Sequence, residues 1–355
     1  MRIGILGYPQ SGKTTLFNVL ARAHAPTGSF ASAAGGIHVG TVQVPDPRLE
    51  ALRDLFQPKK FTPARIEYVD LAGTSGSREG SGSLLPPQIT SADLLLLVVR
   101  AFQDDAVHHP SGSVDPKRDL QSLADELVLK DLAVLEGRVT RLRKGKQVGA
   151  KDAASELALL ERCMTQLEAG APLRDLEFTP DEEKALRGYG LLTAKPMMVV
   201  FNMGDDQETH GELAALLASQ HAVSAVEIRG KAEMEIAELP PDEAREFMEL
   251  MGITESGLDR VIRGSYDLLG VCSFFTVGED EVRAWTIPLE TPAVRAAGAI
   301  HSDLERGFIR AEVIASRDLL ASGGLPQAKA KNLMRVEGKD YRVLDGDVLN
   351  IRFSV

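Results

Sequence analysis

The sequence predicts an α/β fold built on a parallel sheet, interrupted by a helical hairpin and followed by a small α+β domain. Three observations support this prediction. A glycine-rich loop lies between an apolar strand and an amphipathic helix in residues 2–21. Apolar runs at 94–99 and 196–202 are typical of parallel strands that are covered on both faces. Between these runs, apolar residues recur at alternating steps of four and three, as in a coiled-coil hairpin.

The glycine-rich loop matches the phosphate-binding pattern G-x-x-x-x-G-K-[ST] at every fixed position. Its glycines let backbone N–H groups surround phosphate oxygens, and the helix start adds its positive dipole end. Lys13 is long enough to reach the β- and γ-phosphates, and the Thr14 hydroxyl can ligate Mg²⁺. The alternative, a chance glycine-rich turn, does not explain the correct order of strand, loop and helix. The predicted nucleotide contacts of this loop are Gly7, Pro9, Gln10, Ser11, Gly12, Lys13, Thr14 and Thr15.

Length, hydropathy and charge limit the class of protein. A chain of 355 residues is long enough for two or three domains, each with its own core. No apolar run approaches ~20 residues, so we expect no transmembrane helix and no membrane partner. Met1 leads directly into a strand without a leader pattern, and Cys163 and Cys272 lack metal-type spacing, so the expected location is cytoplasmic. The net charge of −11 argues against wholesale coating of a polyanion, but a local basic patch is compatible with it.

A second motif follows the predicted strand at residues 65–70. The strand ends in the D-x-x-G sequence that runs from Asp70 to Gly73. In P-loop switch proteins this aspartate steers Mg²⁺, and the glycine N–H senses the γ-phosphate. The predicted metal-binding residues are therefore Thr14 and Asp70.

Two later strand ends complete the predicted nucleotide site. Asn202 ends the apolar strand 196–202, where it would hold the nucleotide loops together and can hydrogen-bond the base. Gly230 and Lys231 follow the strand 223–228, in the place of the last base-contacting loop. These motifs together predict a P-loop, GTPase-type domain with a Rossmann-like sheet, which is discontinuous in the sequence.

The helical insertion is predicted from its periodicity. Its two heptad-like segments contain Val128, Leu132, Leu135, Val139, Leu142, Leu157, Leu160, Met164 and Leu167. The link region from Gly137 to Lys151 carries six cations and no acid, namely Arg138, Arg141, Arg143, Lys144, Lys146 and Lys151. On so acidic a chain, this basic hairpin tip indicates a contact with RNA or phosphate. A solvated hairpin end is the alternative, and the residues alone leave it open.

The chain resembles the YchF/Obg-like ATPase family, within the translation-factor class of P-loop GTPases, over essentially its whole length. The resemblance rests on the phosphate loop and on segments 44–49, 67–73, 282–288, 307–311, 337–341 and 345–348. The last four segments resemble the family's TGS domain, a small β-grasp module of RNA- and ribosome-associated proteins. Periodicity and turns alone would predict only a compact α+β domain there. The predicted division is 1–118 with 193–275 for the nucleotide-binding domain, 119–192 for the coiled-coil insertion, and 276–355 for the TGS-like domain.

The resemblance implies a monomeric ATPase that uses Mg²⁺ and faces the ribosome with its insertion and TGS-like domain. The family recognises its base with N-x-x-E, where ordinary GTPases use N-K-x-D. Here Met203 replaces the lysine, as in the family, but Asp205 restores the shorter acid. Met203 can present its backbone N–H and an apolar face to either purine, whereas a carboxylate at 205 could accept two hydrogen bonds from guanine. ATP is therefore expected to be favoured over GTP, with a GTP-specific switch as the alternative.

For hydrolysis, the resemblance assigns the catalytic histidine of the family to His109. Without it, His109 would be interpreted as part of an exposed loop. Lys13 and Gly73 are the other predicted catalytic residues, because both would face the γ-phosphate. Thr74 occupies the place of the water-orienting glutamine of the wider class, and Ala34 lies near that of a family threonine that completes Mg²⁺ coordination. The sequence thus predicts a divergent member with slow or altered hydrolysis.

Three functions are compatible with these residues. The first is a ribosome-associated ATPase or GTPase switch, and the second is a nucleotide-binding regulatory module with negligible turnover. The third is a metabolic kinase, which ranks last because the sequence contains no acceptor-substrate motif and the TGS-like C-terminus would be unexplained.

Overall fold

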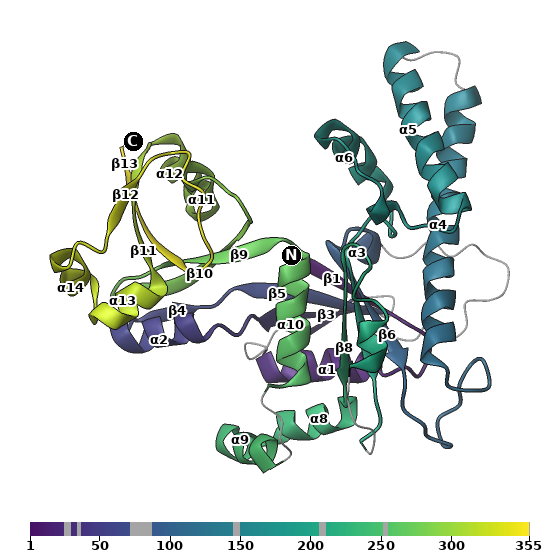
Figure 1. Cartoon of the computed structure of the whole chain (residues 1–355), viewed down its shortest axis with the longest axis horizontal. Coiled ribbons are helices and arrows are strands. Elements are labelled where there is room, and N and C mark those ends of the chain that lie inside the picture. The colour runs from purple at the N-terminus through teal and green to yellow at the C-terminus, as the bar shows by residue number, and fades with distance from the viewer. Residues whose placement is uncertain are drawn as a thin grey trace. The chain divides into compact units, whose positions relative to one another are not determined.

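The chain packs as two compact units, and most of their elements are labelled in Figure 1. The first consists of Met1–Val42 and Glu67–Gly264, and the second of Gln43–Ile66 and Ser265–Val355. The computed structural model describes residues 1–24, 30–33, 37–71, 87–144, 150–205, 211–250 and 255–354.

The described residues of the first unit form a seven-stranded sheet in the order β2-β3-β5-β1-β6-β7-β8. Its strands are β1 (Arg2–Leu6), β2 (Phe30–Ala33), β3 (Ile37–Gln43), β5 (Arg65–Leu71), β6 (Leu94–Arg100), β7 (Met197–Asn202) and β8 (Val223–Ile228). The strands from β5 to β8 run parallel, and β2 pairs antiparallel with β3. Because these strands are parallel, the carboxyl ends of β1, β5, β6, β7 and β8 lie together at one edge of the sheet. We call this edge the carboxyl edge.

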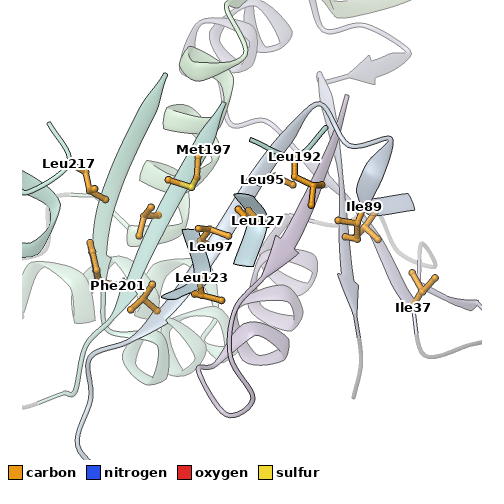
Figure 2. Packing of buried hydrophobic residues seen from close by; sticks show 13 residues of the cluster. Ile37, Ile89, Leu95, Leu97, Leu123, Leu127, Leu192, Met197, Phe201 and Leu217 are labelled. Atoms are coloured by element: carbon orange, nitrogen blue, oxygen red, sulfur yellow. The ribbon is translucent and has the colours of Figure 1, made fainter. Parts of the chain in front are cut away.

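Continuous apolar sequence explains why β6 and β7 lie in the sheet interior. Every residue of both strands is buried, as expected for a parallel sheet that is covered on both faces. Figure 2 shows one cluster of this core, in which Leu123 and Leu127 of α4 pack with Leu95, Leu97 and Phe201. The helices of this unit are α1 (Lys13–His24), α3 (Pro87–Thr90), α4 (Pro116–Lys144), α5 (Ala150–Glu168), α6 (Pro180–Leu186), α7 (Glu212–Ala215), α8 (Gly230–Glu238), α9 (Pro241–Leu250) and α10 (Gly257–Leu268), with 3-10 turns η1 (Leu173–Asp175) and η2 (Arg187–Tyr189).

Helices α4 and α5 lie side by side as a hairpin (Figure 1). The heptad-like residues form its core, in which Leu135 and Val139 pack with Leu160, Cys163 and Leu167. The apolar period of four and three is therefore sufficient to define the contact face of both helices.

A buried carboxylate fixes the base of this hairpin. Asp131 of α4 accepts hydrogen bonds from the backbone N–H groups of Leu192 and Thr193, both at 2.8 Å, and from the Thr193 hydroxyl at 2.6 Å. Burial raises the pKa of Asp131, and the same hydrogen bonds oppose that shift. The insertion is thus tied to the segment that leads into β7.

The second unit is built on a six-stranded sheet of the described residues, in the order β12-β11-β13-β9-β10-β4. Its strands are β4 (Lys60–Thr62), β9 (Val271–Thr276), β10 (Glu281–Pro288), β11 (Phe308–Ala315), β12 (Arg335–Glu337) and β13 (Asp347–Phe353). Its helices are α2 (Pro47–Phe56), α11 (Ala293–Ile300), α12 (Ser302–Arg306), α13 (Ser316–Ser322) and α14 (Leu325–Ala330). Parallel and antiparallel pairs are mixed, so this unit has an α+β architecture.

Residues 43–66 belong to the second unit, although the predicted division assigns them to the nucleotide-binding domain. The physical reason is contact with residues that are far away in the sequence. Strand β4 pairs with β10, and the apolar face of α2 buries Leu49 and Leu52 against Phe275 and Val282. Local sequence patterns contain no information on such a partner. Residues 265–275, which the predicted division also assigns to the nucleotide-binding domain, pack in the second unit as well. The predicted division itself stays a prediction. No helix in the described ranges is long and apolar enough to span a membrane.

Candidate functional site

The phosphate loop leaves β1 and enters α1 through two glycines with positive φ angles. Gly7 has φ +149° and Gly12 has φ +96°. A Cβ atom on Gly7 would lie 2.3 Å from the carbonyl oxygen of Val98, and one on Gly12 would lie 2.2 Å from Nδ2 of Asn202. Both the backbone conformation and the available space therefore require glycine at these positions.

Lys13 closes this loop on itself. Its ammonium group donates to the carbonyl oxygens of Gly7 at 2.9 Å and Tyr8 at 2.6 Å. Burial lowers the pKa of Lys13, and the nearby charge of Asp70 opposes this shift. The side chain thus holds a positive charge at the loop, where phosphate oxygens would replace the two carbonyls as its acceptors.

Thr14 and Asp70, the two predicted metal-binding residues, are in direct contact. The Oγ1 atom of Thr14 donates to Oδ2 of Asp70 at 3.0 Å. Asp70 lies on β5 opposite Ile5 of β1, so the sheet register places its carboxylate beside the start of α1. A hydroxyl and a carboxylate are the oxygen donors that Mg²⁺ prefers, with phosphate and water oxygens as its other ligands. The residues therefore fit Mg²⁺, although no group of three or more His, Cys, Asp or Glu with metal-site geometry occurs in the described residues.

Most of the predicted nucleotide-binding residues line one pocket at the carboxyl edge. Its volume is about 750 Å³, within the usual range for a small-molecule site. The predicted residues in its wall are Gln10, Gly12, Lys13, Thr14, Thr15, Asn202, Met203, Asp205, Gly230 and Lys231. Gly7, Pro9 and Ser11 belong to the same loop but do not line the pocket.

Asn202 joins the phosphate loop to the loop before α8. Its Nδ2 atom donates to the carbonyl oxygen of Ser11 at 3.1 Å, and its Oδ1 atom accepts from the Gly230 N–H at 3.1 Å. The side chain is 8% exposed, and a Cβ on Gly230 would lie only 2.6 Å from Oδ1. Asn202 thus sets the distance between the two loops that border the pocket.

One predicted contact of the base-recognition residues is not available in the structure. The Met203 N–H, expected to be available to the purine, donates instead to the carbonyl oxygen of Ile228 at 2.7 Å. The reason is that β7 and β8 continue their pairing by one residue beyond the strand end. Asp205 lies at the pocket, where its Oδ2 atom is 3.3 Å from Nζ of Lys231. The apolar side chain of Met203 and the Asp205–Lys231 pair therefore remain as groups that could contact a base.

His109 is buried and held away from the pocket wall. Only 6% of it is exposed, its Nε2 atom is 2.9 Å from Oδ2 of Asp119, and its Nδ1 atom accepts from the Ser111 N–H at 3.1 Å. Both ring nitrogens thus face protein atoms, and its catalytic role stays a prediction that requires the loop to move. The predicted catalytic Gly73, together with Thr74 and Ala34, lies outside the described residues.

Arg100 is a site residue that the motifs did not indicate. It is 3% exposed and donates to the carbonyl oxygens of Phe102, Asp104 and Val107 at 3.2, 3.1 and 2.9 Å. These three residues line the pocket, so Arg100 shapes the loop that forms one of its walls. In the sequence, the signal that could have indicated Arg100 is its position as a single cation at the end of an otherwise apolar strand.

The basic hairpin tip is partly neutralised within the hairpin. Arg138 pairs with Glu156 at 2.9 and 3.0 Å, and Arg143 pairs with Glu161 at 2.7 Å. Arg141 is exposed and, among the described residues, donates to the carbonyl oxygen of Gly137 at 3.0 Å and to no carboxylate. Lys144 is also exposed, whereas Lys146 and the side chain of Lys151 lie outside the described residues.

Two protein-family models match the chain. One, described as a 50S ribosome-binding GTPase, matches residues 2–135. The other, for the C-terminal domain of YchF GTPases and described as a protein of unknown function, matches residues 271–354.

Relatives with similar sequences cover the full length. The ribosome-binding ATPase YchF of Bacillus subtilis (strain 168) is 42% identical over 362 residues, which is 99% of each chain. That of Escherichia coli O157:H7 is 40% identical over 360 residues, covering 100% of this chain and 99% of the other. Among solved structures, the YchF GTPase of Schizosaccharomyces pombe matches with a TM-score of 0.84 and 30% identity, covering 99% of this chain and 97% of that chain. Two of these names specify an ATPase and one a GTPase.

Proposed function

The chain belongs to the YchF family of P-loop nucleotide triphosphatases, and from this premise we propose that it is a ribosome-associated switch that hydrolyses ATP with Mg²⁺. One observation carries the proposal. The phosphate loop, Asn202 and the Gly230–Lys231 loop border a single pocket of about 750 Å³. Its wall contains Lys13 and Thr14, which suit the phosphates of a nucleotide, together with Asp205 and Lys231, which could contact its base.

The residues around the phosphate loop have the chemistry needed for cleavage of the β–γ bond. The Lys13 ammonium, now bonded to two loop carbonyls, would turn to the phosphate oxygens and offset the charge that develops there. Thr14 and Asp70 are the residues that would hold Mg²⁺, whose chemistry at this place is to neutralise the β- and γ-phosphates. Gly73 is proposed to donate its N–H to the γ-phosphate.

Slow turnover is part of the proposal. His109 would orient the attacking water, but it lies 2.9 Å from Asp119 and does not line the pocket. The loop that carries His109 must therefore rearrange before hydrolysis, and a bound ribosome is the proposed cause of that rearrangement. Activity on ribosomes would place the protein in the cytoplasm.

ATP is the proposed substrate because the groups for guanine recognition are compromised. Met203 stands where a lysine would be expected, and the carboxylate of Asp205 is 3.3 Å from the ammonium of Lys231. A GTP-specific switch is the second candidate. It is favoured by the aspartate at position 205, because N-K-x-D ends in aspartate whereas the family pattern N-x-x-E ends in glutamate.

The ribosomal contact is proposed to involve the basic hairpin tip and the C-terminal unit. Arg141, Arg143 and Lys144 are exposed, and of these only Arg143 forms an ion pair within the described residues, so Arg141 and Lys144 could contact phosphates of RNA. The C-terminal unit enters the proposal through its TGS-like segments and through the names of its relatives.

Phosphate release from ATP and from GTP, measured with and without purified ribosomes, tests the proposal. We expect slow release alone, faster release with ribosomes, and neither in Lys13→Ala. Nucleotide binding without release in either condition would support the regulatory module instead. Faster release of phosphate from GTP than from ATP would favour the GTP-specific switch.

A further inference from the structure

His38 lies beside the two residues proposed to hold Mg²⁺, and no motif accounts for it. It is the second residue of β3, the neighbour of β5 in the sheet. Its Nδ1 atom is 4.0 Å from Oδ2 of Asp70, the same oxygen that Thr14 contacts at 3.0 Å. Side chains from β3, β5 and α1 therefore meet at one carboxylate oxygen.

The spacing of these atoms suits the ligands of one cation. Around an octahedral ion with bonds of ~2.1 Å, neighbouring ligands lie ~3.0 Å apart and opposite ligands ~4.2 Å apart. The Thr14–Asp70 distance of 3.0 Å equals the first value, and the His38–Asp70 distance of 4.0 Å is close to the second. Both separations are therefore compatible with ligands of one octahedral ion.

The surroundings of His38 do not require an imidazole for structural reasons. The side chain is 32% exposed, and its ring lies 6.0 Å from the ring of Phe17 at an interplanar angle of 34°. A contact of 4.0 Å to a carboxylate at this exposure contributes little to stability. Phe17 holds one side of the ring, and a ring nitrogen faces the carboxylate.

We propose that His38 is a further ligand of the catalytic cation and that it shifts the site from Mg²⁺ towards transition-series cations such as Mn²⁺. The inference rests on the proposed function, because the phosphate oxygens of a bound nucleotide supply the remaining ligands. Imidazole nitrogen is a good ligand for first-row transition ions, whereas Mg²⁺ prefers a shell of oxygens. Nitrogen from His38, with oxygen from Thr14 and Asp70, therefore selects between the two classes.

Mn²⁺ is the probe, because it is paramagnetic and substitutes for Mg²⁺. The full chain is titrated with Mn²⁺ in the presence of a non-hydrolysable ATP analogue, and electron paramagnetic resonance measures free and bound ion. Pulsed measurements on the complex should detect ¹⁴N coupling, which changes to ¹⁵N coupling after selective labelling of histidine. His38→Ala should abolish the coupling and weaken Mn²⁺ binding at least about tenfold, while Mg²⁺ binding, measured by competition, stays nearly unchanged.

The matched control is His221→Ala. Like His38, His221 lies in the first unit and does not line the pocket, but its Nδ1 atom contacts the carbonyl oxygen of Arg174 at 2.7 Å and not the carboxylate of Asp70. This variant should keep the coupling and the Mn²⁺ affinity of the parent. If His38→Ala fails to fold, the labelling experiment on the parent and on His221→Ala decides the question.

The outcomes separate the two proposals. Nucleotide-dependent Mn²⁺ binding without nitrogen coupling, and with equal affinity in His38→Ala, would overturn the inference and leave the proposed function intact. Absence of any nucleotide-dependent Mn²⁺ binding would overturn both.

Discussion

Polar side chains have different roles in the two sheets of this protein. At the carboxyl edge of the first sheet, Asn202 and Arg100 hold backbone loops around an open pocket. In the second sheet, by contrast, Asp347 and Tyr341 close on one another, with the Tyr341 hydroxyl donating to Asp347 at 2.7 Å. Lys13, Asp205 and Lys231 leave charges at the wall of that pocket, whereas the second sheet satisfies its buried charge within the fold. Substitutions should therefore cost binding at the first place and stability at the second.

The network of the second unit is centred on a buried carboxylate. Asp347 is 2% exposed and also accepts from the Leu344 N–H at 3.0 Å. Arg335 lies 3.7 Å from its other oxygen and donates to the Tyr341 hydroxyl at 3.0 Å. These contacts fix the turn that leads into β13.

The largest expected effect is that of Asp347→Ala on stability. Tyr341 and Leu344 would each lose an acceptor at ~1–3 kcal/mol, so the second unit should lose about 3 kcal/mol in its free energy of unfolding. Urea unfolding measures this loss, and Asp340→Ala, an exposed aspartate of the same unit, is the control. The affinity of the folded protein for ATP should not change. Equal urea midpoints for Asp347→Ala and Asp340→Ala would contradict the comparison.

Lys13→Ala should show the opposite behaviour, with binding lost and stability retained. Removal of a charge-assisted contact to phosphate costs roughly 1.5–3 kcal/mol, which is about a tenfold to a hundredfold loss of affinity. Stability should hold, because burial lowers the pKa of Lys13 and the ammonium is therefore an unfavourable group in the empty protein. Calorimetric titration with ATP measures the effect.

Lys195→Ala is the matched control for this second prediction. Lys195 is also partly buried, burial lowers its pKa, and it donates to the carbonyl oxygen of Ala92 at 2.6 Å. It does not line the pocket. Wild-type ATP affinity in folded Lys13→Ala, or an equal loss in Lys195→Ala, would refute the phosphate role.

High pH should weaken the second unit through Tyr341. Burial, and then the hydrogen bond to Asp347, raises the pKa of Tyr341 from 10 to about 12. A raised pKa in the folded state means that this contribution to stability is complete below pH 10 and is lost as the pH rises to about 12. Urea unfolding at a series of pH values should show a steeper loss in the parent than in Tyr341→Phe. Parallel curves would show that the hydroxyl does not titrate as this network requires.

The hairpin tip offers a comparison of cations that form an ion pair within the described residues with cations that form none there. Arg141→Ser with Lys144→Ser should weaken ribosome association and reduce its salt slope by ~0.7–0.9 for each phosphate contact that is lost. Arg138→Ser with Arg143→Ser should have less effect on association, because Glu156 and Glu161 already neutralise these side chains. Co-sedimentation with ribosomes over a range of salt concentrations measures both. Equal binding of both double variants and the parent would leave the solvated hairpin end as the explanation.

Local patterns were sufficient to predict the framework of the first unit. The strand ends at Leu6, Asn202 and Ile228 coincide with the predicted ends, because a continuous apolar run and a following glycine or polar residue are both local signals. The hairpin was predictable for the same reason, since its contact face repeats along each helix. The α/β fold with a P-loop GTPase-type domain is thereby confirmed.

Contacts between distant residues could not be obtained in this way. The Arg138–Glu156 pair depends on how the two helices are aligned. The Met203 N–H already donates a hydrogen bond to Ile228, because the end of β8 lies beside it. The burial of His109 against Asp119 depends on the path of a loop without periodicity. In each case the three-dimensional neighbour, and not the residue type, determines which atoms remain available.

The smallest expected effect concerns Asp205→Ala and the affinity for ATP. Oδ2 of Asp205 is 3.3 Å from Nζ of Lys231, with 44% and 68% of the two side chains exposed. An exposed pair of this kind contributes ~0–1 kcal/mol, so its loss should change ATP binding by less than ~1 kcal/mol. Guanine differs, because it would donate two hydrogen bonds to a free carboxylate at 205, worth on the order of 1–3 kcal/mol. Competition of ATP and GTP for one labelled analogue measures both affinities.

Lys231→Ala sharpens this last comparison, because it releases Asp205 from its partner without removing the carboxylate. If the pair keeps the carboxylate from guanine, GTP should gain affinity relative to ATP in Lys231→Ala and should gain none in Asp205→Ala. A tenfold preference of the parent for GTP that disappears in Asp205→Ala would show that the carboxylate already binds guanine despite Lys231. The ATP assignment would then fail, and the pocket would belong to a GTPase.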